Sequence, residues 1–254
     1  MEISNFSIDL LAILFLVAII AGFIDTLAGG GGLITLPALM ISGIPPLAVL
    51  GTNKLQGSFG TATSTYMMLK HKRIHWHDVK LLMLFAFIGS VLGSIVVQFI
   101  NVAVLSFVIP VVLLLISIYF AFSPMPNNDD SKPRVSIHKY QYGVVPVIGW
   151  YDGMFGPGTG SFFSLAGVSL RGHALLKATA IAKPLNFATN IASLFVFIAA
   201  GQIVWAFGIV MLFGQMIGAW LGSHCLFKIN PIYLRIIVVI MCIGMIIKYI
   251  INIE

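Results

Sequence analysis

Long runs of apolar residues constrain the fold of this chain more than any other feature of its sequence. The runs 10–21, 81–100 and 102–122 contain no charged residue. A helix needs about 20 apolar residues to cross the hydrocarbon core of a bilayer, which is about 30 Å thick. Charged residues make up only 9% of the 254 residues, too few for the surface of a soluble domain. The sequence therefore predicts an all-α polytopic integral membrane protein and excludes a soluble enzyme.

The net charge of +6 is explained by basic loops at the membrane surface. Membrane lipid is thus an expected partner, and no nucleic acid partner is expected. The two cysteines, Cys225 and Cys242, lie in apolar segments, which gives no support for a disulfide framework or a metal site. We expect neither a metal nor a cofactor. The first apolar run lacks a basic leader and a cleavage site, so we expect it to be a retained helix.

An internal repeat organises the chain, with matching residues 127 to 129 positions apart. The matched features include rare residue types, which are listed here: Asp25 with Asp152, the glycine run 29–32 with 156–160, Lys54 with Lys183, Trp76 with Trp205, and Gly89-x-x-x-Gly93 with Gly218-x-x-x-Gly222. We predict two homologous halves, 1–126 and 137–254, joined by the polar cytoplasmic linker 127–136.

Each half is predicted to contain four long helices and one short one. The expected segments are 8–28, 33–43, 47–70, 78–99 and 103–122, then 140–155, 161–170, 174–199, 205–226 and 232–250. If all five segments of each half lie in the membrane, the two halves have opposite orientations, and 11 of the 12 Lys and Arg residues outside the apolar segments face the cytoplasm. If only the four long segments cross it, the halves have the same orientation, and 8 of these residues face the cytoplasm while 4 face outside. The positive-inside rule favours the inverted repeat, with both termini outside.

The short segments 33–43 and 161–170 follow glycine-rich breaks and are too short to span a bilayer alone. Broken helices at corresponding places of two halves indicate the binding site of a transporter. Free N–H groups at a helix start carry partial positive charge and favour an anion. The predicted substrate-binding residues of the breaks are Gly29, Gly30, Gly31, Gly32, Gly158, Thr159 and Gly160. The alternative is that these glycines only permit close helix packing.

Four ionisable residues lie well inside apolar segments, namely Asp25, Lys54, Asp152 and Lys183. Charges at this depth are costly and are functional candidates by default. The aspartates stand just before the breaks, where they can cap free N–H groups or carry a coupling proton, and we predict that they carry the proton and that the lysines bind the anion. The alternative is that they form two structural Asp–Lys pairs. The neighbouring polar residues that can line a substrate path, or else bond helices together, are Asn53, Gln56, Thr61, Asn186 and Asn190, of which Asn53, Gln56 and Asn186 complete the predicted substrate site.

Two further patterns are interpreted as structural. The G-x-x-x-G spacings lie in apolar segments and are typical of helices that pack closely. His71, His75 and His77 surround Trp76 in the most basic loop, which predicts an interfacial anchor in preference to a metal site.

The segment G-F-I-D-T-L-A-G-G-G-G-L-I-T-L-P-A-L (22–39), followed by G-T-N-K-L-Q (51–56), resembles the opening signature of the TauE/SafE-type sulfite exporter family, also known as the toluene sulfonate uptake permeases. The resemblance covers nearly the whole chain. The second half departs from it, because Pro157 interrupts the glycine run, no proline matches Pro37, and Ala182-Lys183-Pro184 replaces Asn-Lys-Leu. The resemblance implies a multi-pass permease of the bacterial inner membrane for sulfite, sulfonates or related organosulfur anions, driven by the proton gradient.

The sequence as a whole predicts a secondary transporter of a small anion and not an enzyme, since no nucleophile with a base is visible at membrane depth. A passive anion channel and a non-catalytic membrane subunit of a sulfur-metabolism pathway are the alternatives. A homo-oligomer is compatible with the sequence. The sequence does not determine the anion, the direction of transport or the coupling ion.

Overall fold

The computed structural model describes residues 7–122, 129–226 and 240, and all regular secondary structure in this part of the chain is helical. The helices of the first half are α1 (Ile8–Ala28), α2 (Gly32–Ile41), α3 (Pro46–Lys70), α4 (Trp76–Gln98) and α5 (Val102–Phe122). Those of the second half are α6 (Ile137–Lys139), the π-helix η2 (Tyr140–Val144), α7 (Val145–Met154), α8 (Thr159–Arg171), α9 (Leu175–Ala199) and α10 (Trp205–Cys225). The expected segment 232–250 lies outside the described residues.

Five of the described helices are long and apolar enough to cross a membrane. They are α1, α4, the Val102–Tyr119 part of α5, α9 and α10. Large apolar side chains such as Leu92, Phe107 and Phe213 point outward from them and are 55%, 72% and 57% exposed. Several apolar helices with apolar outer faces make this a multi-pass membrane protein.

Helix α3 has the length of a membrane span, 25 residues, but is too polar to count as one by composition. Its position in the bundle explains this difference, because α3 packs against α9 and α10 and also touches α1, α2 and α5. The side chains of Asn53, Gln56 and Thr61 are buried between these helices and not exposed to lipid. Burial among polar partners removes the cost that hydrocarbon would impose on them.

The expected helix 140–155 is not one continuous α-helix. A π-turn occupies Tyr140–Val144, and a regular α-helix follows with Pro146 near its start. The backbone N–H of Val145 donates to the carbonyl oxygen of Tyr140, five residues back. Proline has no N–H group, so Pro146 cannot continue an i→i−4 ladder, and the chain changes its hydrogen-bond pattern just before it.

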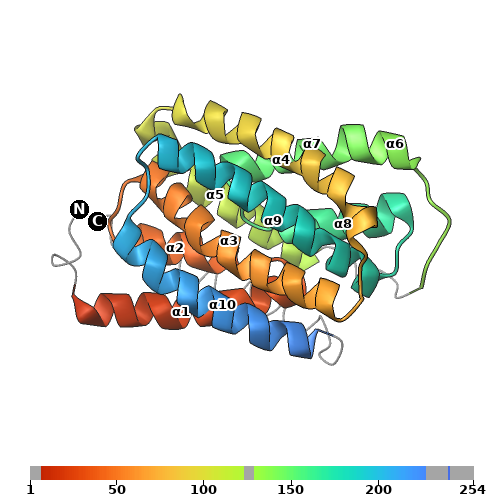
Figure 1. Ribbon diagram of the computed structural model, residues 1–254. Coiled ribbons are helices and arrows are strands. Elements are labelled where there is room, and N and C mark those ends of the chain that lie inside the picture. Colours follow the sequence, from red (N-terminus) through yellow and green to blue (C-terminus); the bar gives the residue numbers. More distant parts are fainter. Residues whose placement is uncertain (1–6, 123–128, 227–239, 241–254) are drawn as a thin grey trace.

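Helices α3 and α9 run side by side through the centre of the bundle (Figure 1). Helix α10 packs on α3 and also contacts α1, while α4 packs on α9 and also contacts α7. Glycines permit close contact between α4 and α7 and between α10 and α1. A Cβ added at Gly93 of α4 would lie 2.0 Å from the backbone oxygen of Trp150, and one at Gly222 of α10 would lie 2.8 Å from that of Phe23. The packing interpretation of the G-x-x-x-G pattern is therefore confirmed.

Candidate functional site

The two helix breaks meet each other in the middle of the protein. Helix α1 ends at Gly29, which has a left-handed backbone with φ of 73°. A Cβ at Gly29 would lie 2.3 Å from the backbone nitrogen of Ser161, so only glycine fits there. The Ser161 hydroxyl donates to the carbonyl oxygen of Ala28 at the end of α1. The start of α8 thus rests directly on the break that follows α1.

The first break is held by Asp25, as its position before the glycines suggests. Asp25 Oδ1 accepts a hydrogen bond of 3.0 Å from the backbone N–H of Gly31, just before α2. A carboxylate at a helix start is stabilised by the free N–H groups and by the helix dipole. Helices α2 and α8 begin at Gly32 and Thr159, slightly earlier than expected, because the glycine residues join the first helical turns.

The two membrane-embedded lysines cross from one predicted half to the other. The Lys54 ammonium donates to the backbone oxygen of Asp152 at 2.5 Å and forms an ion pair with Asp152 Oδ2 at 2.9 Å. The Lys183 ammonium donates to the backbone oxygen of Asp25. Each lysine therefore binds a carbonyl near the C-terminal end of α7 or α1, where the helix dipole favours a cation. The Asp25 oxygen accepts from the Gly29 N–H as well.

The two crossed contacts differ at their carboxylates. Asp152 is 1% exposed and holds its partner lysine through both its backbone and its side chain. Asp25 is only partly buried, and its carboxylate is directed to Gly31 while its backbone oxygen accepts from Lys183. Asp152 is thus ion-paired with its lysine, whereas the Asp25 carboxylate forms no ion pair with a side chain among the described residues.

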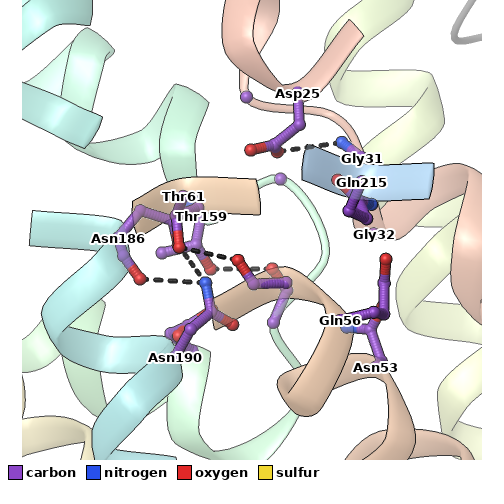
Figure 2. Close-up of a pocket in the computed structure, with 15 residues that line it drawn as sticks. Asp25, Gly31, Gly32, Asn53, Gln56, Thr61, Thr159, Asn186, Asn190 and Gln215 are labelled. Atoms are coloured by element: carbon purple, nitrogen blue, oxygen red, sulfur yellow. Dashed lines mark hydrogen bonds between the residues drawn. The ribbon is translucent and has the colours of Figure 1, made fainter. Parts of the chain in front are cut away.

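A cavity of about 30 Å³ lies between the breaks and the polar faces of α3 and α9 (Figure 2). A space of this size holds about one or two water molecules. Its lining residues are Asp25, Gly29, Gly31, Gly32, Asn53, Gln56, Gly57, Thr61, Asp152, Gly156, Gly158, Thr159, Asn186, Asn190 and Gln215. Carboxylates, amides, hydroxyls and glycine backbone therefore form its wall, and none of the described lysines, arginines or histidines belongs to it.

The amides of α3 and α9 are arranged by hydrogen bonds among themselves. Asn53 Oδ1 accepts from the Thr35 hydroxyl at 2.6 Å and from Gln56 Nε2 at 2.7 Å. Gln56 Oε1 is buried without a hydrogen-bond partner in the described structure. Asn190 Nδ2 donates to the backbone oxygen of Asn186 at 2.9 Å. A buried polar atom without a partner is costly, so the free oxygen of Gln56 marks a place for a hydrogen-bond donor such as a water molecule.

The structure brings most of the predicted site residues to this cavity. Ten of them line it, namely Asp25, Gly29, Gly31, Gly32, Asn53, Gln56, Asp152, Gly158, Thr159 and Asn186, whereas Gly30, Lys54, Gly160 and Lys183 do not. Sequence reasoning passed over Gly57, Gly156 and Gln215 as site residues. The signal for Gln215 was available, because it is the only amide in the apolar helix 205–225.

The described residues contain no group of three or more His, Cys, Asp or Glu side chains that could hold a metal ion. A bound anion would therefore depend on amides, hydroxyls and backbone N–H groups. It would also face the carboxylates of Asp25 and Asp152; Lys54 forms an ion pair with Asp152, and the Lys183 ammonium lies at the backbone oxygen of Asp25.

Comparison with known proteins gives a consistent result. The family model described as "Sulfite exporter TauE/SafE" matches residues 14–249. A "Probable membrane transporter protein" of Haemophilus influenzae is 44% identical over 237 residues, which cover 93% of this chain and 93% of that protein. The "Probable membrane transporter protein YfcA" of Escherichia coli K12 is 42% identical over 231 residues, covering 91% and 86%.

A more distant relative, the "Probable membrane transporter protein YunE" of Bacillus subtilis, is 24% identical over 236 residues, covering 83% of this chain and 86% of that protein. No solved structure matches the chain. The matched proteins are described as membrane transporters and not as enzymes. With a family model that spans most of the sequence and relatives above 40% identity, the chain belongs to the sulfite exporter TauE/SafE family.

Proposed function

We propose that this protein is a secondary transporter of a small anion, most suitably sulfite, a sulfonate or a related organosulfur anion, and that transport is coupled to protons. One observation carries the proposal: two helix breaks, one from each half, meet at a polar cavity inside the helical bundle that is lined by the carboxylates of Asp25 and Asp152. Helix starts favour an anion, and broken helices let the ends around a site move apart.

The charges around the cavity support the proton as the coupling ion. Two carboxylates line the cavity and repel an entering anion; Lys54 forms an ion pair with Asp152, whereas Lys183 binds the backbone oxygen of Asp25 and not its carboxylate. Protonation of Asp25 removes one negative charge from the cavity wall and makes anion binding more favourable, which couples the two binding events. Asp25 is thus the first proton carrier to examine, and Asp152 the second.

The inverted arrangement of the halves is part of the proposal. Gly93 and Gly222 are 129 residues apart and touch the backbones of Trp150 and Phe23, which are 127 residues apart. Corresponding glycines thus contact corresponding partners in the other half, which supports one repeated unit used twice. The concentration of Lys and Arg in loops on one side of the expected topology supports opposite orientations of the units.

The bacterial inner membrane is the location that the proposal implies. The relatives named above come from bacteria, and one of the matched proteins belongs to Escherichia coli, whose proton gradient lies across its inner membrane. The polar linker 127–136 would then face the cytoplasm between the two halves.

Flux into proteoliposomes tests the proposal. Vesicles with the native protein should accumulate a labelled anion from a panel of sulfite, thiosulfate, taurine and sulfoacetate when a pH gradient is imposed. Asp25→Asn should abolish this accumulation while downhill exchange continues, because the helix starts and amides stay in place. Asp9→Asn is the matched control, since Asp9 lies exposed at the other end of α1.

Two results would contradict the proposal. If Asp25→Asn vesicles still accumulate anion in response to the gradient, Asp25 only caps the helix start. If the native protein equilibrates every anion of the panel without accumulation under any gradient, it is a passive channel.

A further inference from the structure

A second and larger hollow lies on the outer surface, between the C-terminal parts of α3 and α10. Its volume is about 510 Å³, and it is separate from the central cavity. Tyr66 and Trp220 border it and are 60% and 51% exposed. Met67 and Met216 supply apolar lining, while Lys70 belongs to its basic part. The hollow thus combines an apolar wall with a cationic group, and none of its described lining residues carries a carboxylate.

Two histidines extend the basic part of this groove. His71 of the loop after α3 and His224 of α10 both line it, with ring centroids 6.2 Å apart. Nδ1 of His71 lies 2.8 Å from the backbone oxygen of Met67, and Nδ1 of His224 lies 2.8 Å from that of Trp220. A carbonyl oxygen only accepts, so each Nδ1 carries the hydrogen. Nε2 of each neutral ring therefore bears a lone pair and can accept a hydrogen bond from a hydroxyl group of a ligand.

We propose that this groove binds a phospholipid with an anionic headgroup. The Lys70 ammonium, 5.8 Å from the centroid of the Tyr66 ring, lies beside aromatic side chains of the kind that mark the headgroup level of a bilayer. The phosphate contacts the Lys70 ammonium, the headgroup lies beside His71 and His224, and an acyl chain runs along Met67 and Met216. Basic pockets between membrane helices are suited to such headgroups, and each lysine adds a favourable electrostatic contribution.

The internal repeat allows the basic residues of this groove to be compared with the corresponding positions of the other half. The positions that correspond to Tyr66, Lys70, His71, Trp220 and His224 in the repeat are Phe195, Ala199, Ala200, Val91 and Ile95. All five are apolar. The lysine and the two histidines of the groove therefore have no basic counterpart at the corresponding positions of the other half.

Native mass spectrometry of the purified full-length protein tests the assignment. The protein is incubated with equimolar phosphatidylglycerol and phosphatidylcholine, and the retained lipid is counted. Wild type should retain phosphatidylglycerol preferentially, and Lys70→Gln should weaken this retention about fivefold, the loss expected for one lysine at an anionic headgroup. Lys80→Gln is the matched control, because it removes the same charge from the neighbouring exposed start of α4 without touching the groove.

Three outcomes would overturn the assignment. The first is equal retention of the two lipids by wild type, and the second is an equal loss in Lys70→Gln and Lys80→Gln. The third is displacement of phosphatidylglycerol by an equal concentration of inorganic phosphate, which would identify the groove as a site for free anions. Because Lys70 is exposed at a helix end, the variant should elute like wild type, so a changed retention reports on the groove.

Discussion

Removal of the Lys54 ammonium tests whether the crossed lysines hold the bundle together. Lys54 and Asp152 form an ion pair at 2.9 Å, with side chains 1% and 2% exposed. Lys54→Met keeps most of the side-chain volume but leaves the Asp152 carboxylate buried without its cation. Breaking a buried pair in this way costs about 3–5 kcal/mol of unfolding free energy.

Lys183→Met provides the comparison, because this lysine donates to a backbone carbonyl while the Asp25 carboxylate bonds to Gly31. Loss of a charge-assisted hydrogen bond costs about 1.5–3 kcal/mol. We therefore expect Lys54→Met to be the less stable variant, by about 2 kcal/mol.

The free energy of unfolding of both variants is measured in mixed micelles. Circular dichroism follows the loss of helix as the fraction of denaturing detergent rises. The double variant Lys54→Met with Asp152→Leu completes a thermodynamic cycle and should recover about 1–3 kcal/mol relative to the sum of the single changes. A cycle without coupling, or a Lys183→Met variant as unstable as Lys54→Met, would refute the reasoning.

Two further predictions concern topology and packing. A cysteine at Gly201, in a background without the two native cysteines, should be labelled by an impermeant reagent from outside the cell; labelling only from inside would exclude the inverted arrangement. Gly93→Ala should destabilise the protein by about 1–3 kcal/mol, because its Cβ would meet the backbone of α7, whereas Gly143→Ala, with open space around it, should stay within about 1 kcal/mol of wild type in the same unfolding assay.

Helix positions were predictable where hydropathy and capping agree. The segment 8–28 coincides with α1, whose start is capped by Ser7 and whose end is fixed by Gly29. The segment 205–226 is nearly α10, Trp205–Cys225. The π-turn before Pro146 was missed, because a hydropathy pattern identifies an apolar segment but not the hydrogen-bond spacing within it. The last expected helix, 232–250, stays a prediction.

The candidate site was predictable in its residue types but not in its connections. Asp25 and Asp152 were found because charges are rare in apolar segments, and both line the cavity. The contact between Lys54 and Asp152 could not be deduced from the sequence, because the spacing of residues within one helix does not identify the helices that pack against it. Tertiary packing also brings Gln215 of α10 to the cavity, where it joins residues more than 150 positions earlier in the chain.

The crossed lysine contacts have a consequence for how the chain is made. Lys54 and the carbonyl it binds are 98 residues apart. At a synthesis rate of about 5–20 residues per second, the first half waits about 5–20 seconds before its partner leaves the ribosome. During that time the lysine and the amides of α3 lack their partners from the second half, and the charge alone disfavours α3 as an independent span by about 2.5–3.5 kcal/mol. We therefore expect α3 to reach its final depth in the membrane only when the second half arrives.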